Sequence, residues 1–439
     1  MDIFIKASQF ILSLSLLIIL HELGHFIPAK IFKTKVEKFY LFFDPYFSIF
    51  KKKIGGTEYG IGWLPLGGYV KIAGMVDESM DKEQMAKPPQ PWEFRSKPTW
   101  QRLIIMIGGV TVNVVLAIVI YAGMAMSYGE DYLPNENMVY GISTDSIGTS
   151  IGIQGGDKIL AIGATKIARY SDIGREMILT EENSITVERN GKKEKLTFTD
   201  AQKGLIIAQK SRFISPRAPY VLEAIMDSSN AEGILMVGDS IVGLNGNPLP
   251  YFDQYLVEVP KFAGKEVVFN IYRNGKRENL SVLVPEGGKV GMAPKAAGHF
   301  LTFAHTDYTF LESIPKGLSM AKKQLVDYTR QLGVIFTPET KAYKEVGGFL
   351  MIYDQFPSVW DWRFFWGFTA FLSIMLAFLN ILPIPALDGG HVVFVLWEMI
   401  SGRKPSQKVL EYSQVVGFII LLSLILLVNG NDFWKAIFG

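Results

Sequence analysis

The chain of 439 residues is long enough for about two to four domains, and its net charge of +2 gives no global field for nucleic acid. It contains no cysteine, which excludes disulfides, thiolate zinc sites and a cysteine nucleophile. Aromatic residues at 13% and a mean hydropathy of +0.22 favour a membrane protein. Any histidine-based metal site must draw on five residues, namely His21, His25, His299, His305 and His391.

The first apolar segment, Ala7–Ala29, reaches the length of about 20 residues that spans a bilayer, and Glu22 is its single charge. The run is too long for a cleavable signal peptide, and no small-residue cleavage site follows it. We therefore predict a retained membrane span. Toward its end it reads His21-Glu22-Leu23-Gly24-His25, an H-E-x-x-H pattern.

On a helix, His21 and His25 project from one face, and neutral imidazoles suit Zn²⁺. Glu22 is turned by about 100° from His21, which puts its carboxylate beside the metal, where it can take a proton from bound water. The pattern is short, so a chance match or a structural polar cluster is the alternative. Polar side chains inside a span are costly unless they are paired or hydrated, which favours the metal site.

The segment Thr57–Gly74 alternates bulky residues with glycine and then turns at Pro65–Gly68, which predicts a β-hairpin with an open edge. Strand addition to that edge would hold a substrate extended through main-chain hydrogen bonds. An ordinary cytoplasmic hairpin is the alternative. The candidate substrate contacts are Gly60, Ile61, Gly62 and Trp63.

A second span is predicted at Leu103–Ser127, which carries no charge. Within it, Gly108–Val115 offers a small-residue face for close helix packing. Asn113 lies on this segment and could reach the site, but we interpret it as structural.

The following region, from about residue 129 to 363, contains two similar stretches. The Gly-Asp pairs ending at Asp157 and Asp239 lie 82 residues apart, and the Arg-Asn-Gly-Lys turns starting at Arg189 and Arg273 lie 84 apart. Short β-runs and Asn-Gly turns surround them, which suits two copies of one small domain. They resemble a tandem PDZ pair, and two generic β-rich modules are the alternative.

The segment Leu311–Phe336 has apolar residues at helical spacing with lysine and arginine between them, which predicts an amphipathic helix. Such a helix can lie on a membrane surface or pack on the protein. The sequence leaves both open.

Third and fourth spans are predicted at Phe364–Ile384, which Pro383 interrupts, and at Val415–Val428. Asp388 follows the interruption and is the only acid between Trp362 and Glu398. Irregular backbone at membrane depth requires protein or a wet cavity around it, and an acid there points to function. Asp388 is therefore the candidate third metal ligand, and helix capping is the alternative.

Two further residues near Asp388 are candidates for supporting roles. Asn380 is a lone amide in an apolar run, and a hydrogen bond between helices is an equal explanation for it. His391 lies three residues past Asp388 and suits a hydrogen bond around the site better than direct ligation.

Lysine follows the first predicted span at Lys30, Lys33, Lys35 and Lys38, and Lys51–Lys53 adds a run. Basic residues also fill the short segment between the third and fourth spans, so both segments are predicted to be cytoplasmic. The first and third spans then run in the same direction, and the two motifs can meet at one depth.

The motifs together resemble the site-2 protease family: H-E-x-x-H in a first span, N-x-x-P-x-P-x-L-D-G at 380–389 in a later one, and PDZ-like modules between. The two modules are similar to the regulator-of-sigma-E branch of that family. The resemblance covers nearly the whole chain. It implies an intramembrane endopeptidase with one Zn²⁺ per chain, with His21, His25 and Asp388 as ligands and Glu22 as catalytic acid and base. It also assigns Asn380 to substrate handling, and a membrane-reentrant β-element to residues 57–74.

We therefore expect a multi-pass α-helical membrane protein with four transmembrane helices, a membrane-associated β-hairpin and two inserted PDZ-like domains. The expected parts are a first membrane half at 1–128, PDZ-like domains at 129–210 and 211–295, an amphipathic connection at 296–362, and a second membrane half at 363–439.

The resemblance implies a bacterial inner-membrane location, with the PDZ-like domains outside and the active site toward the cytoplasm. It implies single-span substrates such as anti-sigma factors trimmed first by a site-1-type protease, or remnant signal peptides. The PDZ-like domains would act as a size filter or bind a new C-terminus. No nucleic-acid partner is expected.

Two other classes of protein compete with this interpretation. A non-catalytic PDZ scaffold in the membrane would not need the complete set of His21, Glu22, His25 and Asp388. A metal transporter would need a relay of sites along a path, and this cluster is single.

Overall fold

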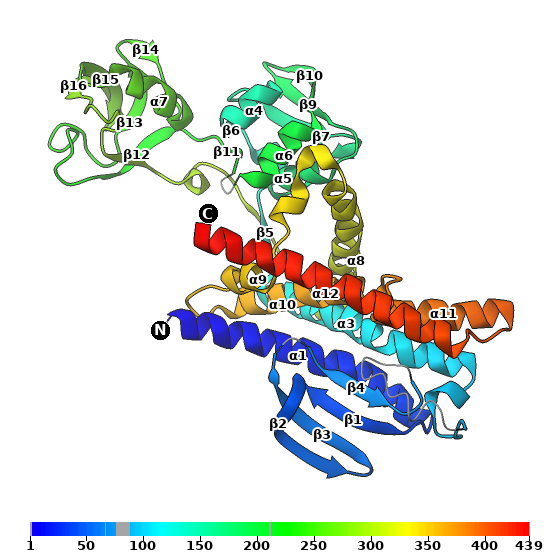
Figure 1. Ribbon diagram of the computed structural model, residues 1–439. Coiled ribbons are helices and arrows are strands. Elements are labelled where there is room, and N and C mark those ends of the chain that lie inside the picture. The colour runs from blue at the N-terminus through cyan, green and yellow to red at the C-terminus, as the bar shows by residue number, and fades with distance from the viewer. Residues whose placement is uncertain (1, 66, 76–87, 210–211, 439) are drawn as a thin grey trace. The chain divides into compact units, whose positions relative to one another are not determined.

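The computed structural model describes residues 2–65, 67–75, 88–209 and 212–438, and it divides into two compact units (Figure 1). The helical unit comprises Met1–Gly129, Asp307–Thr329 and Val346–Gly439. The β-rich unit comprises Glu130–Thr306 and Arg330–Glu345. The candidate metal ligands all fall in the helical unit.

Four helices of the helical unit are long and apolar enough to cross a membrane: α1 (Asp2–Ile31), α3 (Thr99–Tyr128), α10 (Trp362–Ile381) and α12 (Gln407–Phe438), the last through its part up to Gly430. The first two contain the predicted spans. The third ends at Ile381 instead of Ile384, because Leu382 precedes Pro383 and takes an extended conformation with ψ of 142°. The fourth begins at Gln407, since its polar first turns are also helical.

Hydrogen bonds between helices fix their directions. Ser13 of α1 meets Thr369 of α10 at 2.9 Å, and His21 meets Asn380 at 3.3 Å, so residue numbers rise together and the two helices run parallel. Between α1 and α3 the order reverses, since His25 meets Ile105 and His21 meets Asn113. The first and third apolar helices therefore run in the same direction, as predicted.

Glycine lets α1 and α3 come close together. A side chain on Gly24 would collide with the backbone of Gly108, and one on Gly108 would collide with the backbone of Gly24. The predicted small-residue face is confirmed, and it brings the H-E-x-x-H turn of α1 against α3.

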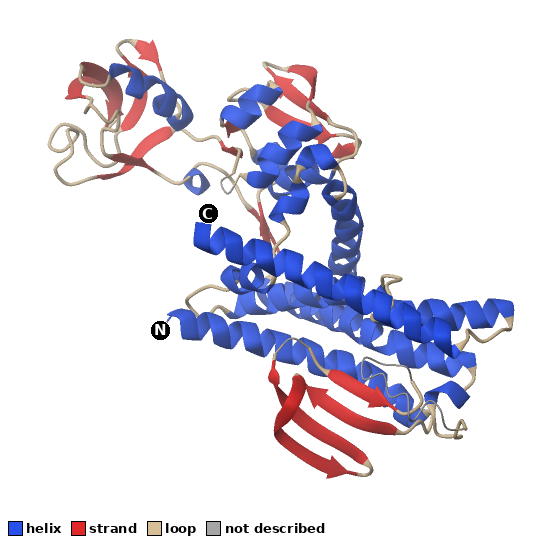
Figure 2. Ribbon diagram, in the orientation of Figure 1, coloured by secondary structure: helices blue, strands red, loops and turns tan. Residues whose placement is uncertain are grey.

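A four-stranded sheet lies beside α1 (Figure 2). Its order is β2-β3-β1-β4, with β1 (Val36–Leu41), β2 (Phe43–Ile54), β3 (Thr57–Leu64) and β4 (Tyr69–Ile72). The hairpin predicted within residues 57–74 is wrong in its pairing, because β1 lies between β3 and β4, parallel to the first and antiparallel to the second. Val36 and Tyr40 of β1 are fully buried, so this strand takes an inner position that its lysine-rich surroundings did not indicate.

The hairpin in this sheet joins β2 to β3 one strand earlier. Ile54 pairs with Thr57, and the two-residue turn is Gly55-Gly56, with φ of 56° and 86°. Positive φ at both central residues is the geometry that two-residue hairpin turns favour, and glycine adopts it without strain.

The amphipathic helix predicted at 311–336 is confirmed as α8 (Phe310–Ile335). Within the helical unit, its Ala321 and Tyr328 pack with the apolar residues of α3 and α10. Phe310 and Leu311 remain exposed at its start. The helical unit also contains α9 (Phe349–Gln355) and α11 (Asp388–Ser401).

The β-rich unit has two separate apolar cores. The elements around the first, which we term the first module, are β6 (Ile142–Thr144), α4 (Ser146–Ile151), β7 (Lys158–Ile162), β8 (Thr165–Lys166), α5 (Tyr170–Leu179), β9 (Ser184–Arg189), β10 (Lys192–Thr197), α6 (Asp200–Ala208) and β11 (Ile214–Pro216). Those of the second module are β12 (Tyr220–Ile225), β13 (Ser240–Leu244), β14 (Asn247–Pro248), α7 (Phe252–Glu258), β15 (Glu266–Arg273), β16 (Lys276–Leu283) and β17 (Met292–Pro294). The short strands β5 (Glu130–Tyr132) and β18 (Ala304–Thr306) pair where the chain enters and leaves the two modules.

The two modules contain the same buried ion pair. In the first, Arg189 donates to both carboxylate oxygens of Asp157 at 2.8 and 2.7 Å. In the second, Arg273 donates to Asp239 at the same two distances. The Gly-Asp and Arg-Asn-Gly-Lys motifs therefore recur together because each aspartate needs its arginine.

Candidate metal centre

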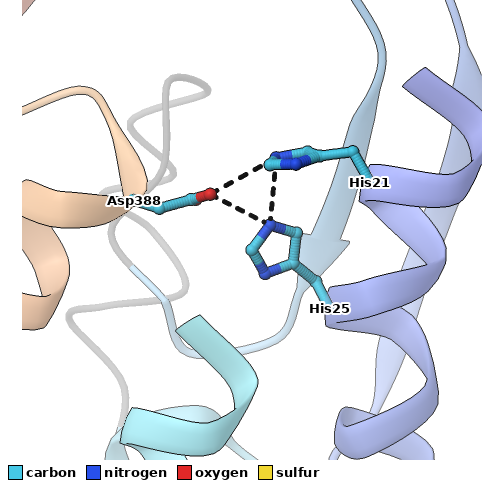
Figure 3. A group of neighbouring side chains, drawn as sticks. All are labelled: His21, His25 and Asp388. Atoms are coloured by element: carbon cyan, nitrogen blue, oxygen red, sulfur yellow. Dashed lines mark hydrogen bonds and ion pairs between the residues drawn. The ribbon is translucent and has the colours of Figure 1, made fainter. Parts of the chain in front are cut away.

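Two histidine side chains of helix α1 bring their imidazole rings together. His21 and His25 are one turn apart, both are buried, and their Nε2 atoms lie 3.3 Å from each other (Figure 3). Because side chains four residues apart share a helix face, the sequence spacing alone accounts for this pairing.

The third group comes from the break after α10. Asp388 is the first residue of α11, and its Oδ2 lies 3.3 Å from Nε2 of His21 and 3.3 Å from Nε2 of His25. Leu387 holds the N-cap position, so the capping role considered for Asp388 is not what the structure contains. The same Oδ2 is buried and forms no hydrogen bond, which leaves it unpaired apart from the two imidazoles.

The three donor atoms fit a tetrahedral cation. They form a triangle with edges of 3.3 Å, and three corners of a tetrahedron about 2.0 Å from its centre are about 3.3 Å apart, which matches zinc–nitrogen and zinc–oxygen bonds. Among the described residues, His21, His25 and Asp388 are the one such group of three. Three protein ligands leave the fourth position open, as in catalytic zinc sites.

The protonation of His25 agrees with this role. Its Nδ1 lies 2.8 Å from the carbonyl oxygen of Ile105, and a carbonyl only accepts, so the ring proton is on Nδ1. The lone pair of Nε2 then points at Asp388. When the ring is neutral, this lone pair is free to bind a metal that Asp388 also faces.

The broken backbone before α11 positions Asp388. Ala386 has φ of 78°, a left-handed conformation that costs free energy in a residue with a side chain, and such strain concentrates at functional sites. Its N–H points to Oε1 of Gln414 on α12 at 3.3 Å. Gly389 and Gly390 lie against the carbonyl groups at the end of α10 and the start of the loop, where a side chain would collide.

Glu22 lines the same cavity as His21, His25 and Asp388 and is not part of their triangle of donor atoms. The cavity has a volume of about 390 Å³, and β4 contributes Tyr69–Ile72 to its lining together with His391. Glu22 is buried, with 9% of its surface exposed. It is therefore a carboxylate beside the donor set with room for water and a substrate chain.

Among the predicted substrate contacts, Asn380 lies at the site, with Nδ2 3.3 Å from Nε2 of His21. The other four, Gly60–Trp63, belong to β3. The open edge expected there is corrected, because β3 pairs with β2 on one side and β1 on the other. Among the strands that the structure describes, β4 is the edge strand next to the cavity. Sequence reasoning missed this because strand order depends on non-local pairing.

Asn113 is the other residue whose position sequence reasoning missed. We interpreted it as structural, yet its amide nitrogen lies 3.1 Å from Nδ1 of His21, and the side chain is fully buried. One available signal was its place on the small-residue face, four residues after Gly109. A side chain on Gly109 would collide with both imidazoles, so this face of α3 lies against the two candidate histidine ligands.

Comparison with known proteins agrees with this geometry. The family model described as Peptidase family M50 matches residues 9–424. A regulator of sigma E protease from Haemophilus influenzae is 28% identical over 97% of this chain and 98% of its own. Proteins named zinc metalloprotease from Treponema pallidum and Vibrio cholerae are 27% and 28% identical, and each alignment covers at least 95% of both chains. The chain therefore belongs to peptidase family M50, the site-2 protease family of zinc metalloproteases.

Proposed function

We propose that this chain is a zinc-dependent intramembrane endopeptidase that cleaves single-span membrane substrates. The observation that carries the proposal is the triangle of His21, His25 and Asp388, whose three donor atoms lie 3.3 Å apart beside the carboxylate of Glu22. His21, His25 and Asp388 would hold one Zn²⁺ per chain.

When bound, zinc supplies a Lewis acid that polarises the scissile carbonyl and lowers the pKa of water. Glu22 accepts a proton from the attacking water and later donates it to the leaving amine. The burial of Glu22 in the shared cavity keeps its carboxylate close to the reacting atoms. Asn380 is suited to donate from its amide to the substrate, since its nitrogen already lies beside His21.

The substrate would be held as a strand along β4. A transmembrane substrate arrives as a helix, and a helix hides its peptide bonds, so it must unwind before cleavage. The edge of β4 offers main-chain partners, and Tyr69–Ile72 line the cavity that contains Glu22. Strand addition there replaces the helical hydrogen bonds while reading little of the sequence. Ile61 and Trp63 of β3 are partly exposed, and side-chain contacts with the substrate remain our proposal for them.

For the whole chain, we infer a multi-pass protein of the bacterial inner membrane with its metal site toward the cytoplasm. Support comes from four helices of spanning length and from the lysines that follow the H-E-x-x-H end of α1. The two modules are proposed to be repeated PDZ-like domains, outside the membrane, that filter substrates by size or bind a C-terminus left by an upstream protease. Their shared ion pair supports a common origin.

The test measures zinc and cleavage in the same preparations. Purified wild-type protein should contain one zinc per chain and cleave a single-span reporter in nanodiscs. Glu22→Gln keeps the shape of the side chain but removes the base, so zinc content should persist while the cleavage rate falls by roughly 100- to 10,000-fold. Undiminished cleavage by this variant would refute the mechanism, and wild-type protein without zinc would refute the metal site.

A further inference from the structure

The two histidines of the site are held by different kinds of partner. His25 donates from Nδ1 to the main-chain carbonyl of Ile105 at 2.8 Å. His21 presents its Nδ1 to a side chain, the amide of Asn113, at 3.1 Å. A carbonyl can only accept, whereas an amide can accept through oxygen or donate through nitrogen. The proton position on His25 is therefore set by the backbone, and that on His21 is set by Asn113.

The surroundings of Asn113 hold its side chain in a fixed position against His21. Its side chain is fully buried, and its main-chain carbonyl accepts a hydrogen bond of 2.7 Å from the hydroxyl of Ser373 on α10. Gly109, one turn earlier on α3, leaves no room for a side chain between itself and the two imidazoles. Asn113 thus faces His21 from a rigid junction of α1, α3 and α10.

The orientation of the amide decides the chemistry of His21. If Nδ2 donates to Nδ1, the ring proton must lie on Nε2, which then has no lone pair for a metal. Oδ1 of Asn113 is buried and has no hydrogen-bond partner among the described residues. A half-turn of the amide exchanges the two atoms, so that Oδ1 accepts from Nδ1–H and Nε2 is free to bind metal.

We infer that Asn113 is a positioning residue that fixes the metal-binding tautomer of His21. Its oxygen holds the proton on Nδ1, orients the ring and directs the Nε2 lone pair toward the point that Asp388 and His25 also face. The inference rests on the proposed zinc site. In this inference the side chain of Asn113 fixes the ring proton of His21 on Nδ1, as the backbone carbonyl of Ile105 does for His25.

The experiment compares zinc affinity across variants of the full-length protein in nanodiscs, by competition with a chromogenic chelator. Asn113→Leu removes the acceptor at similar volume and should weaken zinc binding by about 10- to 100-fold. Asn113→Asp keeps an acceptor in the same place and should bind zinc nearly as tightly as the wild type. Thr369→Val is the matched control, because it removes the buried hydrogen bond to Ser13 between helices without touching a ligand, and it should leave zinc affinity unchanged.

Three outcomes would overturn the inference. Wild-type affinity in Asn113→Leu would show that the amide is dispensable. Equal weakening in Asn113→Asp and Asn113→Leu would show that packing, and not the acceptor, is what matters. Weakening by Thr369→Val to the same extent would show a general effect of losing a buried hydrogen bond. Should Asn113→Leu fail to fold, Asn113→Ala takes its place in the same comparison.

Failure of the zinc site itself gives a different result. Wild-type protein that binds no zinc would refute the proposed function, whereas zinc binding by the wild type together with tight binding by Asn113→Leu would refute this inference alone.

Discussion

Asp388 of the helical unit and Asp239 of the β-rich unit both bury a carboxylate oxygen, yet their partners differ. Asp239 accepts two hydrogen bonds from Arg273 and a third from the backbone N–H of Met236 at 2.8 Å. Oδ2 of Asp388 has no hydrogen bond and faces two imidazole nitrogens. A buried carboxylate requires a cation or donors, and Asp239 finds them within its own module. Among the described residues, Asp388 faces only the two imidazoles, which is the environment that we propose for a metal ligand.

The same contrast separates structural from functional acids. Asp157 repeats the environment of Asp239 in the first module, including a backbone donor at 2.8 Å from Gln154. Identical surroundings at two places indicate a structural requirement of the module. The surroundings of Asp388 occur once among the described residues, at a cavity that contains Glu22.

The largest effect should follow from Asp388→Ala. Loss of one of three ligands should weaken zinc binding by more than the roughly 100-fold that losing a supporting hydrogen bond can cost, and cleavage should disappear. The fold should persist, because the lost side chain makes no hydrogen bond through Oδ2. Measured zinc content tests the predicted loss of binding, and thermal unfolding of the metal-free protein tests whether the fold persists. Wild-type zinc content in the variant would contradict the ligand assignment.

Asp239→Ala should do the reverse. It leaves Arg273 without its buried carboxylate partner and with only the partly exposed Glu278 at 3.4 Å. The free energy of unfolding of the second module should therefore fall by about 3–5 kcal/mol, while zinc binding is unchanged. Hydrogen exchange in β13 and β15 of the full-length protein measures the loss. Asp157→Ala is the matched variant and should give the same loss in β7 and β9 of the first module only. Loss of zinc by either variant would contradict the distinction between the structural aspartates, Asp157 and Asp239, and the candidate metal ligand Asp388.

Gly109→Ala should have a smaller effect on the metal. The added methyl group would meet Cε1 of His21 at 2.6 Å, so the imidazoles must shift although every ligand is present. We expect zinc affinity to fall by about 10- to 100-fold, as for other disturbances of ligand orientation. Gly123→Ala on the same helix is the control, because nothing lies within 4 Å of its added methyl. Equal affinities in the two variants would show that the ligands tolerate displacement.

The smallest change is expected when a complete ion pair is replaced as a whole. A double variant with Asp239→Leu and Arg273→Met removes both charges of the buried pair, and such replacements are often nearly neutral because no buried charge is left unpaired. Glu278, the other partner of Arg273, is partly exposed to solvent. The second module should therefore exchange hydrogen much more slowly than in Asp239→Ala. A double variant as unstable as the single one would show that the backbone donor at Met236 requires the carboxylate.

Several features of this protein follow from local sequence. The helical spacing of His21 and His25 is sufficient to bring their rings together, since four residues make about one turn. The apolar runs of α1 and α3 predicted spans, and the Gly-Asp and Arg-Asn-Gly-Lys motifs marked two related modules before their ion pairs were known. Asp388 could be singled out because it is a lone acid after two prolines.

Other features depended on contacts between distant segments. The order β2-β3-β1-β4 places β1 inside the sheet and leaves β4 as the edge strand at the cavity, which no local pattern of residues 57–74 specifies. The role of Asn113 is of the same kind, because its amide meets His21 from 92 residues away. Sequence by itself determined which residues have the chemistry for a zinc site, since that depends on side-chain type and helical period. The tertiary structure decided which residues support them and where a substrate strand can bind, because hydrogen bonds between distant segments exist only once the chain is folded.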